Sequence, residues 1–176
     1  FQFMTHSYDS QTQNKEGLQK LVAGTFLANK FPEAGYDTYS DALIYAGKQS
    51  GANPYVLASM ILVEQGRNGI GGSISGTVSG FEGYYNYFNV RAYAFGDYDA
   101  VRASYYAKNY IKNNQNTLYL KKFNVLNGMN NVATHQYMTN IGGAASEANN
   151  LQAGYSSSEH ITFYIPVYKN MPVSAC

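Results

Sequence analysis

An almost wholly apolar stretch covers residues 54–63, and the other elements are arranged around it. Asn53 is a favourable N-cap, Pro54 suits the first helical position, and Gly66 can adopt the left-handed conformation that stops a helix. Apolar side chains fill nearly every position between these ends, so no face of the helix is left for water. The pattern therefore predicts a buried helix over residues 54–65 that runs through the middle of the fold.

Amphipathic patterns on both sides of this stretch predict further helices. These helices cover about residues 14–29, 38–49, 100–113, 116–122 and 141–155. Residues 1–13 have no clear period and should lie extended against the body. Residues 161–168 alternate like a strand, and Pro166 restricts that strand to an edge or to an unpaired extended segment.

Residues 68–95 are dense in glycine and aromatic side chains and have no helical period. We expect short strands or irregular loops there, around Thr77 and Val78 and again over residues 87–90. These would form a small flexible lobe beside the helices. No Gly-Lys-Ser/Thr follows the glycines, which argues against a phosphate-binding loop.

Composition and charge narrow the classes of partner. The formal net charge is +1 and charged residues are 13% of the chain, so it has neither the basic surface of a nucleic-acid-binding protein nor an acidic tail. The 18 Tyr and 9 Phe, with many Asn, Gln, Ser and Gly, give a neutral surface that can stack on and hydrogen-bond to an uncharged polymer, and carbohydrate is the natural candidate. No apolar run approaches the roughly 20 residues that span a membrane, so we expect no membrane insertion.

Metal and thiol chemistry are not indicated. His6, His135 and His160 are dispersed without metal-ligand spacing, and the one cysteine, Cys176, is the last residue. We therefore expect no metal and no cofactor. No Gly-x-Ser-x-Gly nucleophile motif is present either.

Glu64 is the one carboxylate of the apolar helix, and it lies in the last predicted turn. The helix dipole and apolar neighbours both disfavour its negative charge, which should raise its pKa and suit a general acid near neutral pH. The alternative is that Glu64 simply emerges at the surface where the helix ends. A flexible segment and then an aromatic and amide cluster with a second carboxylate, Glu82, follow it, as in a sugar-cleaving cleft.

Several segments together resemble glycoside hydrolase family 73, the bacterial endo-β-N-acetylglucosaminidases that cut peptidoglycan. The matching pieces are residues 57–66 (LASMILVEQG), 82–90 (EGYYNYFNV), 115–119 (QNTLY), 134–140 (THQYMTN) and 164–172 (YIPVYKNMP). The first four cover, in order and spacing, most of residues 39–155. The resemblance implies a mainly α (α+β) fold: a lysozyme-like helical body with a small β-lobe that forms a substrate groove.

The resemblance also implies roles for individual residues. The family's catalytic acid corresponds to Glu64, and its active-site tyrosine corresponds to Tyr137. Glu82 is either the base of an inverting reaction or a solvated surface residue; a third possibility is that the substrate's own N-acetyl group attacks and Tyr137 stabilises the developing charge. Candidate substrate-binding residues are Tyr84, Tyr85, Asn86, Phe88, Asn89, Tyr119, His135 and Gln136. In an alternating strand only one set of side chains can face the cleft, so some of residues 84–89 should be structural.

The expected function is hydrolysis of the GlcNAc-β-1,4-MurNAc bond in cell-wall turnover, daughter-cell separation or autolysis. A muramidase or lytic transglycosylase of lysozyme-like fold, and a non-catalytic glycan-binding module, are the alternatives. We expect residues 1–176 to form one catalytic domain, monomeric, secreted and acting on peptidoglycan glycan strands at the cell wall, with wall-binding domains elsewhere in a longer chain.

Overall fold

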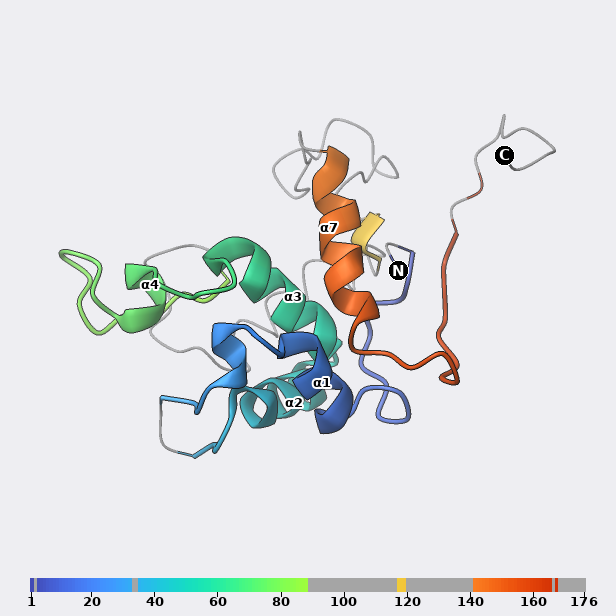
Figure 1. Cartoon of the computed structure of the whole chain (residues 1–176), viewed down its shortest axis with the longest axis horizontal. Coiled ribbons are helices and arrows are strands. Elements are labelled where there is room, and N and C mark those ends of the chain that lie inside the picture. Colours follow the sequence, from blue (N-terminus) through green and yellow to red (C-terminus); the bar gives the residue numbers. More distant parts are fainter. Residues whose placement is uncertain (2, 33–34, 89–116, 120–140, 166, 168–176) are drawn as a thin grey trace.

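A computed structural model of the chain describes residues 1, 3–32, 35–88, 117–119, 141–165 and 167 (Figure 1). This part of the chain is mainly helical. Its elements are α1 (Lys15–Val22), the 3-10 helix η1 (Phe26–Ala28), α2 (Tyr39–Ser50), α3 (Pro54–Gln65), α4 (Gly72–Ser75) and α7 (Ile141–Gln152). The helix expected over residues 100–113, and most of the one expected over 116–122, lie outside the described residues.

Helix α3 is the centre of the fold and contacts α1, α2 and α7. The side chain of Asn53 accepts a hydrogen bond from the backbone N–H of Tyr55 at 2.9 Å, with Pro54 at the first turn, and Gly66 has a φ of 71° just past the last turn. Every residue from 54 to 62 is buried. The predicted central helix is thus confirmed, because its capping residues and its apolar content agree with each other.

The helix expected over residues 14–29 is wrong in its length. Helix α1 begins after its N-cap Asn14, whose side chain accepts from the N–H of Gly17 at 2.9 Å, and ends at residue 22. Gly24 then turns the chain with a φ of 69°, and Thr25 caps the separate 3-10 helix η1. A continuous apolar pattern conceals this break, since the residues on both sides of it are buried in the same core.

Helix α2 is bounded by the predicted signals. Thr38 and Asp41 form a reciprocal capping box at its start, and Gly51, with a φ of 78°, ends it in the left-handed conformation. Its turn to α3 is short. Gly47 lies so close to the backbone of Ala52 that a Cβ there would stand 2.7 Å from the carbonyl oxygen, so only glycine fits.

Residues 68–88 follow α3 and form a segment that extends from the helical body and contains α4 (Figure 1). We call this segment the arm. Short strands or irregular loops were expected here, and apart from α4 residues 68–88 form turns and loops without a strand; residues 89–95 lie outside the described part. Gly76, Gly80 and Gly83 all have positive φ, and the N–H of Gly83 donates to the carbonyl of Gly76 at 2.8 Å. These turns fold the chain back on itself, so the described part of the arm contains no strand of the β-lobe that the resemblance implies.

Residues 3–5 lie beside residues 162–164. Thr5 donates its N–H to the carbonyl of Thr162 at 3.0 Å, and Tyr164 donates to the carbonyl of Phe3 at 2.7 Å. The extended N-terminal segment and the largely unpaired C-terminal segment were both predicted. Helix α7 ends at residue 152, three residues earlier than expected, where Gly154 packs against the ring of Tyr55 too closely for a larger residue.

No helix in the described part of the chain is long and apolar enough to cross a membrane.

Candidate functional site

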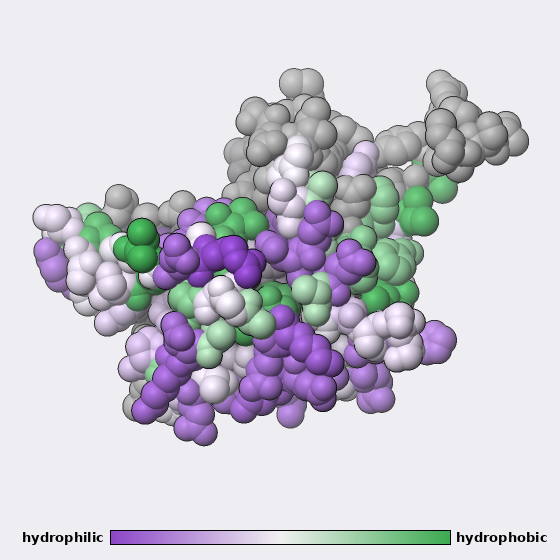
Figure 2. Space-filling model, in the orientation of Figure 1, coloured by the Kyte–Doolittle hydropathy of each residue, from purple (hydrophilic) through white to green (hydrophobic). Residues whose placement is uncertain are grey.

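Glu64 lies in the last turn of α3, at the point where this helix reaches the surface. Residues 54–62 are buried, whereas Val63 is 43% exposed and Glu64 is exposed. Figure 2 shows apolar and strongly hydrophilic side chains next to each other over this end of α3, towards the α4 arm. The alternative to a catalytic role was that Glu64 is an ordinary surface residue at the helix end. An acid that protonates a polymer must also be accessible, so the exposure of Glu64 is compatible with either interpretation.

Large apolar side chains are exposed in the same part of the chain. They belong to the last turn of α3 and to the arm: Val63, Ile70, Phe81 and Tyr84. Scattered exposed apolar side chains are common in soluble proteins, whereas a contiguous patch of them marks a contact surface. Exposed apolar side chains therefore occur close in sequence to the exposed carboxylates Glu64 and Glu82.

Glu82 lies in the turn at the tip of the arm. Its Oε1 accepts a hydrogen bond from the backbone N–H of Gly80 at 3.1 Å, and the side chain is exposed. Hydrogen bonds from its own backbone N–H and from that of Gly80 hold the pKa of Glu82 below its usual range. The group is therefore ionised at neutral pH, which is the state that a general base requires.

Residues 84–88 divide into two groups. Tyr84 is 50% exposed, and Tyr85 is half-buried with its ring against Gly76, where a Cβ would stand 3.0 Å from the ring. Asn86 and Phe88 are each only 5% exposed. Buried side chains have little surface to offer a glycan, so contact with a ligand falls to Tyr84 and Tyr85, and Asn86 and Phe88 are part of the packing beneath them.

Of the remaining predicted site residues, the structure describes Tyr119 alone. The ring of Tyr119 packs against Phe3 of the N-terminal segment, with centroids 5.1 Å apart. Candidates Asn89, His135, Gln136 and Tyr137 lie outside the described residues.

Gln65, the neighbour of Glu64, was missed by the sequence analysis. Its Nε2 donates to the backbone carbonyls of Asn86 at 3.1 Å and of Tyr87 at 3.0 Å, and its Oε1 accepts from Oγ of Ser73 at 2.9 Å. The backbone N–H of Asn86 also donates to the carbonyl of Ser73 at 2.7 Å. We call this group of hydrogen bonds the Gln65 clamp. It ties Ser73 of α4 and the segment around Asn86 and Tyr87 to the end of α3.

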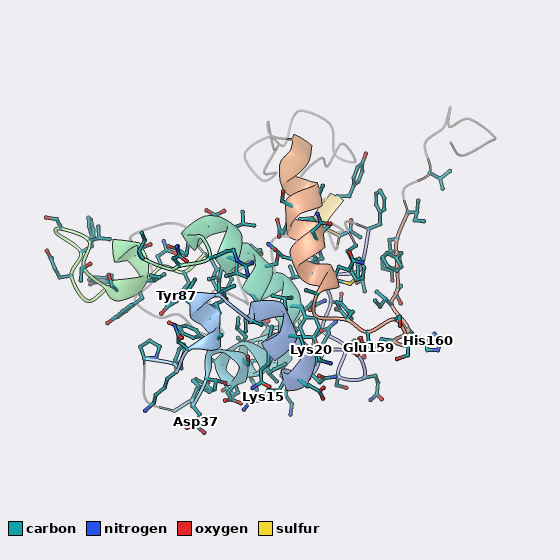
Figure 3. All side chains as sticks on the ribbon, in the orientation of Figure 1. Lys15, Lys20, Asp37, Tyr87, Glu159 and His160 are labelled. Carbon is teal, nitrogen blue, oxygen red and sulfur yellow. The ribbon has the colours of Figure 1, made fainter. Side chains whose placement is uncertain are left out.

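The base of the arm is also held to the helical body by aromatic contacts. The hydroxyls of Tyr39 and Tyr87 are hydrogen-bonded at 3.1 Å in a buried position, and Figure 3 shows Tyr87 where the arm meets the body. The ring of Phe26 packs against both tyrosines. Gly69 lies directly on the ring of Phe26, where a Cβ would stand 2.3 Å from Cγ. Gly69 and Tyr87, where the arm joins the body, are therefore held by aromatic packing in addition to the Gln65 clamp.

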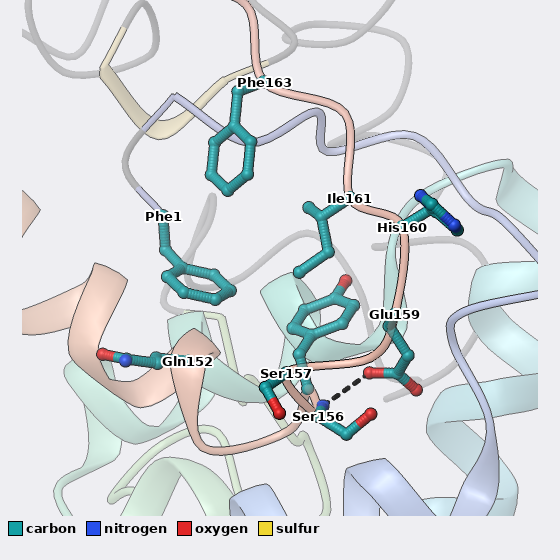
Figure 4. Close-up of a pocket in the computed structure, with 9 residues that line it drawn as sticks. Phe1, Gln152, Ser156, Ser157, Glu159, His160, Ile161 and Phe163 are labelled. Carbon is teal, nitrogen blue, oxygen red and sulfur yellow. Dashed lines mark hydrogen bonds between the residues drawn. The ribbon is translucent and has the colours of Figure 1, made fainter.

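A separate cavity of about 630 Å³ lies beside the C-terminal end of α7 (Figure 4). Its lining is aromatic and hydroxylated, and comprises Phe1, Gln152, Tyr155, Ser156, Ser157, Glu159, His160, Ile161 and Phe163. The hydroxyl of Tyr155 accepts from Nδ2 of Asn53 at 2.8 Å, which places this cavity at the start of α3. Glu64 is at the other end, roughly 16 Å along the helix axis at 1.5 Å per residue. None of the predicted site residues that the structure describes lines this cavity.

Within the described residues, no three His, Cys, Asp or Glu side chains gather in a way that could hold a metal ion.

No protein-family model and no curated protein matches the chain. Its fold is similar to solved structures of S. aureus autolysin E at 22% sequence identity. A complex of that protein with the muropeptide NAM-L-Ala-D-iGlu matches with a TM-score of 0.65 over 88% of this chain and 71% of the other. A further autolysin E structure gives 0.65 over 88% and 70%, and a catalytic glutamate-to-alanine mutant bound to the disaccharide NAG-NAM gives 0.63 over 88% and 71%. The chain therefore has a mainly helical, lysozyme-like fold of the autolysin E type.

Proposed function

We propose that this chain is a peptidoglycan hydrolase that cleaves the β-1,4 bond between N-acetylglucosamine and N-acetylmuramic acid, with Glu64 as general acid. The observation that carries the proposal is the position of Glu64: a carboxylate at the exposed end of the central helix, in a fold of the autolysin E type. The autolysin E structures were determined with a muropeptide and with NAG-NAM, which supports glycan strands as the ligand class. The segments that resemble glycoside hydrolase family 73 support the same reaction.

The chemistry begins with proton transfer from the Glu64 carboxyl to the glycosidic oxygen. The bond between that oxygen and the anomeric carbon breaks as positive charge develops on the sugar ring. Water then adds to the anomeric carbon and loses a proton, so that both sugars leave with hydroxyl groups. The exposed Tyr84 and half-buried Tyr85 would stack on pyranose faces beside the acid.

Water can attack the sugar by two routes, which differ in whether Glu82 takes part. In the first, the ionised Glu82 takes the proton from the attacking water and the anomeric configuration inverts. In the second, the substrate's N-acetyl oxygen attacks first and Tyr137 stabilises the charge that develops. Both routes break the same bond and need the same acid, but the first inverts the anomeric configuration and the second retains it.

The cellular role follows from this substrate. We propose that residues 1–176 form a catalytic domain that works outside the cell, at the wall, in turnover, cell separation or autolysis.

Mass spectrometry of muropeptides released from purified cell walls tests the proposed bond. We expect products with N-acetylglucosamine at the reducing end. Reducing N-acetylmuramic acid would indicate a muramidase, and 1,6-anhydro-N-acetylmuramic acid a lytic transglycosylase. Walls that are bound but release no fragments would indicate a glycan-binding module.

Replacing Glu82 with glutamine separates the two routes. If Glu82 is the base, Glu82→Gln should lower turnover by about 10²- to 10⁴-fold, the usual contribution of a general base. Added azide should restore cleavage and give a glycosyl azide of inverted configuration, because azide attacks without losing a proton. Turnover equal to that of the wild type would remove Glu82 from the mechanism and favour the N-acetyl group. Glu159→Gln, which changes a carboxylate beside the distant cavity, is the matched control.

A further inference from the structure

The Gln65 clamp joins the proposed acid to the aromatic residues of the arm by a short path. Gln65 is adjacent in sequence to Glu64, and both lie in the last turn of α3. Its side-chain amide holds the backbone carbonyl of Asn86, which is two residues from Tyr84 and one from Tyr85. The amide thus sets the distance between the end of α3 and the residues that we propose to stack on sugar.

The clamp requires a glutamine side chain in particular. Its amide presents two N–H donors to two backbone carbonyls and an oxygen to the hydroxyl of Ser73. Glutamate has the same shape but no donor, and its charge would face two carbonyl oxygens. Asparagine is shorter by one methylene group and cannot span the same three partners.

The clamp is not the main source of the arm's stability. Gln65 and Ser73 are only partly buried, whereas the hydroxyl pair of Tyr39 and Tyr87 is buried and so is the ring of Phe26 on which Gly69 lies. These contacts connect the base of the arm to the body without Gln65. A chain that loses the clamp should therefore keep its fold, with a shift confined to the surface beside Glu64.

We infer that Gln65 is a positioning residue, which holds Tyr84 and Tyr85 in register with the Glu64 carboxyl so that the bound glycan meets the acid. The inference rests on the proposed function, since register matters only if Glu64 and these rings act on one substrate. A displacement of about 1 Å between a catalytic group and its substrate can lower the rate about 10²-fold. Small movements of the arm therefore suffice for a large effect.

The test compares Gln65→Met and Gln65→Glu with the wild type on a soluble GlcNAc-MurNAc tetrasaccharide. Both variants should lower kcat by about 10- to 100-fold, because they cannot donate to the two carbonyls. KM should change by less than about threefold, since the aromatic rings remain on the arm. Gln49→Met, on the exposed face of α2, is the matched control and should leave kcat unchanged. All comparisons are made well below the thermal midpoint of each variant.

Ser73 provides a second test of the same contact. Ser73→Ala removes only the donor to Oε1 of Gln65, so its loss of kcat should be smaller than that of Gln65→Met. The double variant Gln65→Met/Ser73→Ala should behave like Gln65→Met alone, because the two residues act through one set of hydrogen bonds. Ser73→Thr keeps the hydroxyl and should retain most of the activity. Additive losses in the double variant would contradict a shared role.

Hydrogen exchange at the Asn86 amide reports on the clamp without any substrate. This N–H donates to the carbonyl of Ser73, and in Gln65→Met it should exchange faster, while amides within α3 keep their protection. Unchanged kcat in Gln65→Met, with an active wild type, would overturn the positioning role and leave the proposed function standing. A wild-type chain that cleaves neither the tetrasaccharide nor walls would overturn the proposed function, and the positioning role with it.

Discussion

Glu64→Gln should abolish wall lysis and leave the chain folded. The amide has nearly the same shape as the carboxyl but cannot deliver a proton to the leaving oxygen, and loss of a general acid lowers rates by about 10²- to 10⁴-fold. Because Glu64 is exposed at the end of α3, the exchange disturbs none of the buried packing of residues 54–62. Turbidity of a suspension of purified walls measures lysis, and circular dichroism measures the helical content.

A matched substitution separates this effect from a general loss of charge. Glu16 is an exposed glutamate of α1 that pairs with Lys20 at 3.2 Å, and a surface pair of this kind contributes little to stability. Glu16→Gln should therefore lyse walls at the wild-type rate. If purified Glu64→Gln retained more than a few per cent of the activity, Glu64 would not be the acid, and the proposed mechanism would have to start from another residue.

The parts of the fold that sequence could predict are those whose limits are set locally. Asn53, Pro54 and Gly66 mark both ends of α3, and the residues between them are apolar on every face, so propensity and burial agree. The end of α1 was not predictable in the same way. Gly24 breaks the helix, yet the apolar residues beyond it continue the helical spacing because they pack into the same core.

The arm shows why short segments rich in glycine are hard to predict. Thr77 and Val78 have strand propensity, but the positive φ values of Gly76 and Gly80 reverse the chain on either side of them. Glycine permits such a turn without requiring it, so the sequence leaves the choice to tertiary contacts. The expectation that some of residues 84–89 would be structural is met by Asn86 and Phe88, but the burial does not alternate: residues 84 and 85 are accessible and residues 86–88 are all buried.

The candidate site was predictable only in part. Glu64 is conspicuous as the single charge in an apolar helix, and the resemblance to a known family gives it a role. The clamp carries no such signal. Gln65 contacts Ser73, eight residues away, and backbone carbonyls 21 and 22 residues away. Every residue has a backbone carbonyl, so the sequence does not indicate which carbonyls a side chain will bind. Contacts of this kind can be identified only from the tertiary structure, which shows how the arm packs against α3.

The second large effect is expected in the core beneath the site, on the same helix as Glu64. Ile61 is 0% exposed in α3, one turn before Glu64. Ile61→Ala should lower the free energy of unfolding by about 2–5 kcal/mol, because it removes buried methyl and methylene groups and leaves a cavity among tightly packed neighbours. A loss of this size is a large fraction of the roughly 5–15 kcal/mol that stabilises a typical domain.

Val63→Ala, two residues further along α3, is the matched control for this prediction. Val63 is 43% exposed, so truncating it should change the free energy of unfolding by no more than about 0.5 kcal/mol. Both changes introduce alanine, the best helix former, so helix propensity favours both variants and does not explain a difference between them. Urea unfolding gives the two values from the shift of the midpoint at an unchanged slope. Equal losses in the two variants would show that α3 does not pass from the core to the surface between residues 61 and 63, and the site would then lack the buried support that holds Glu64 in place.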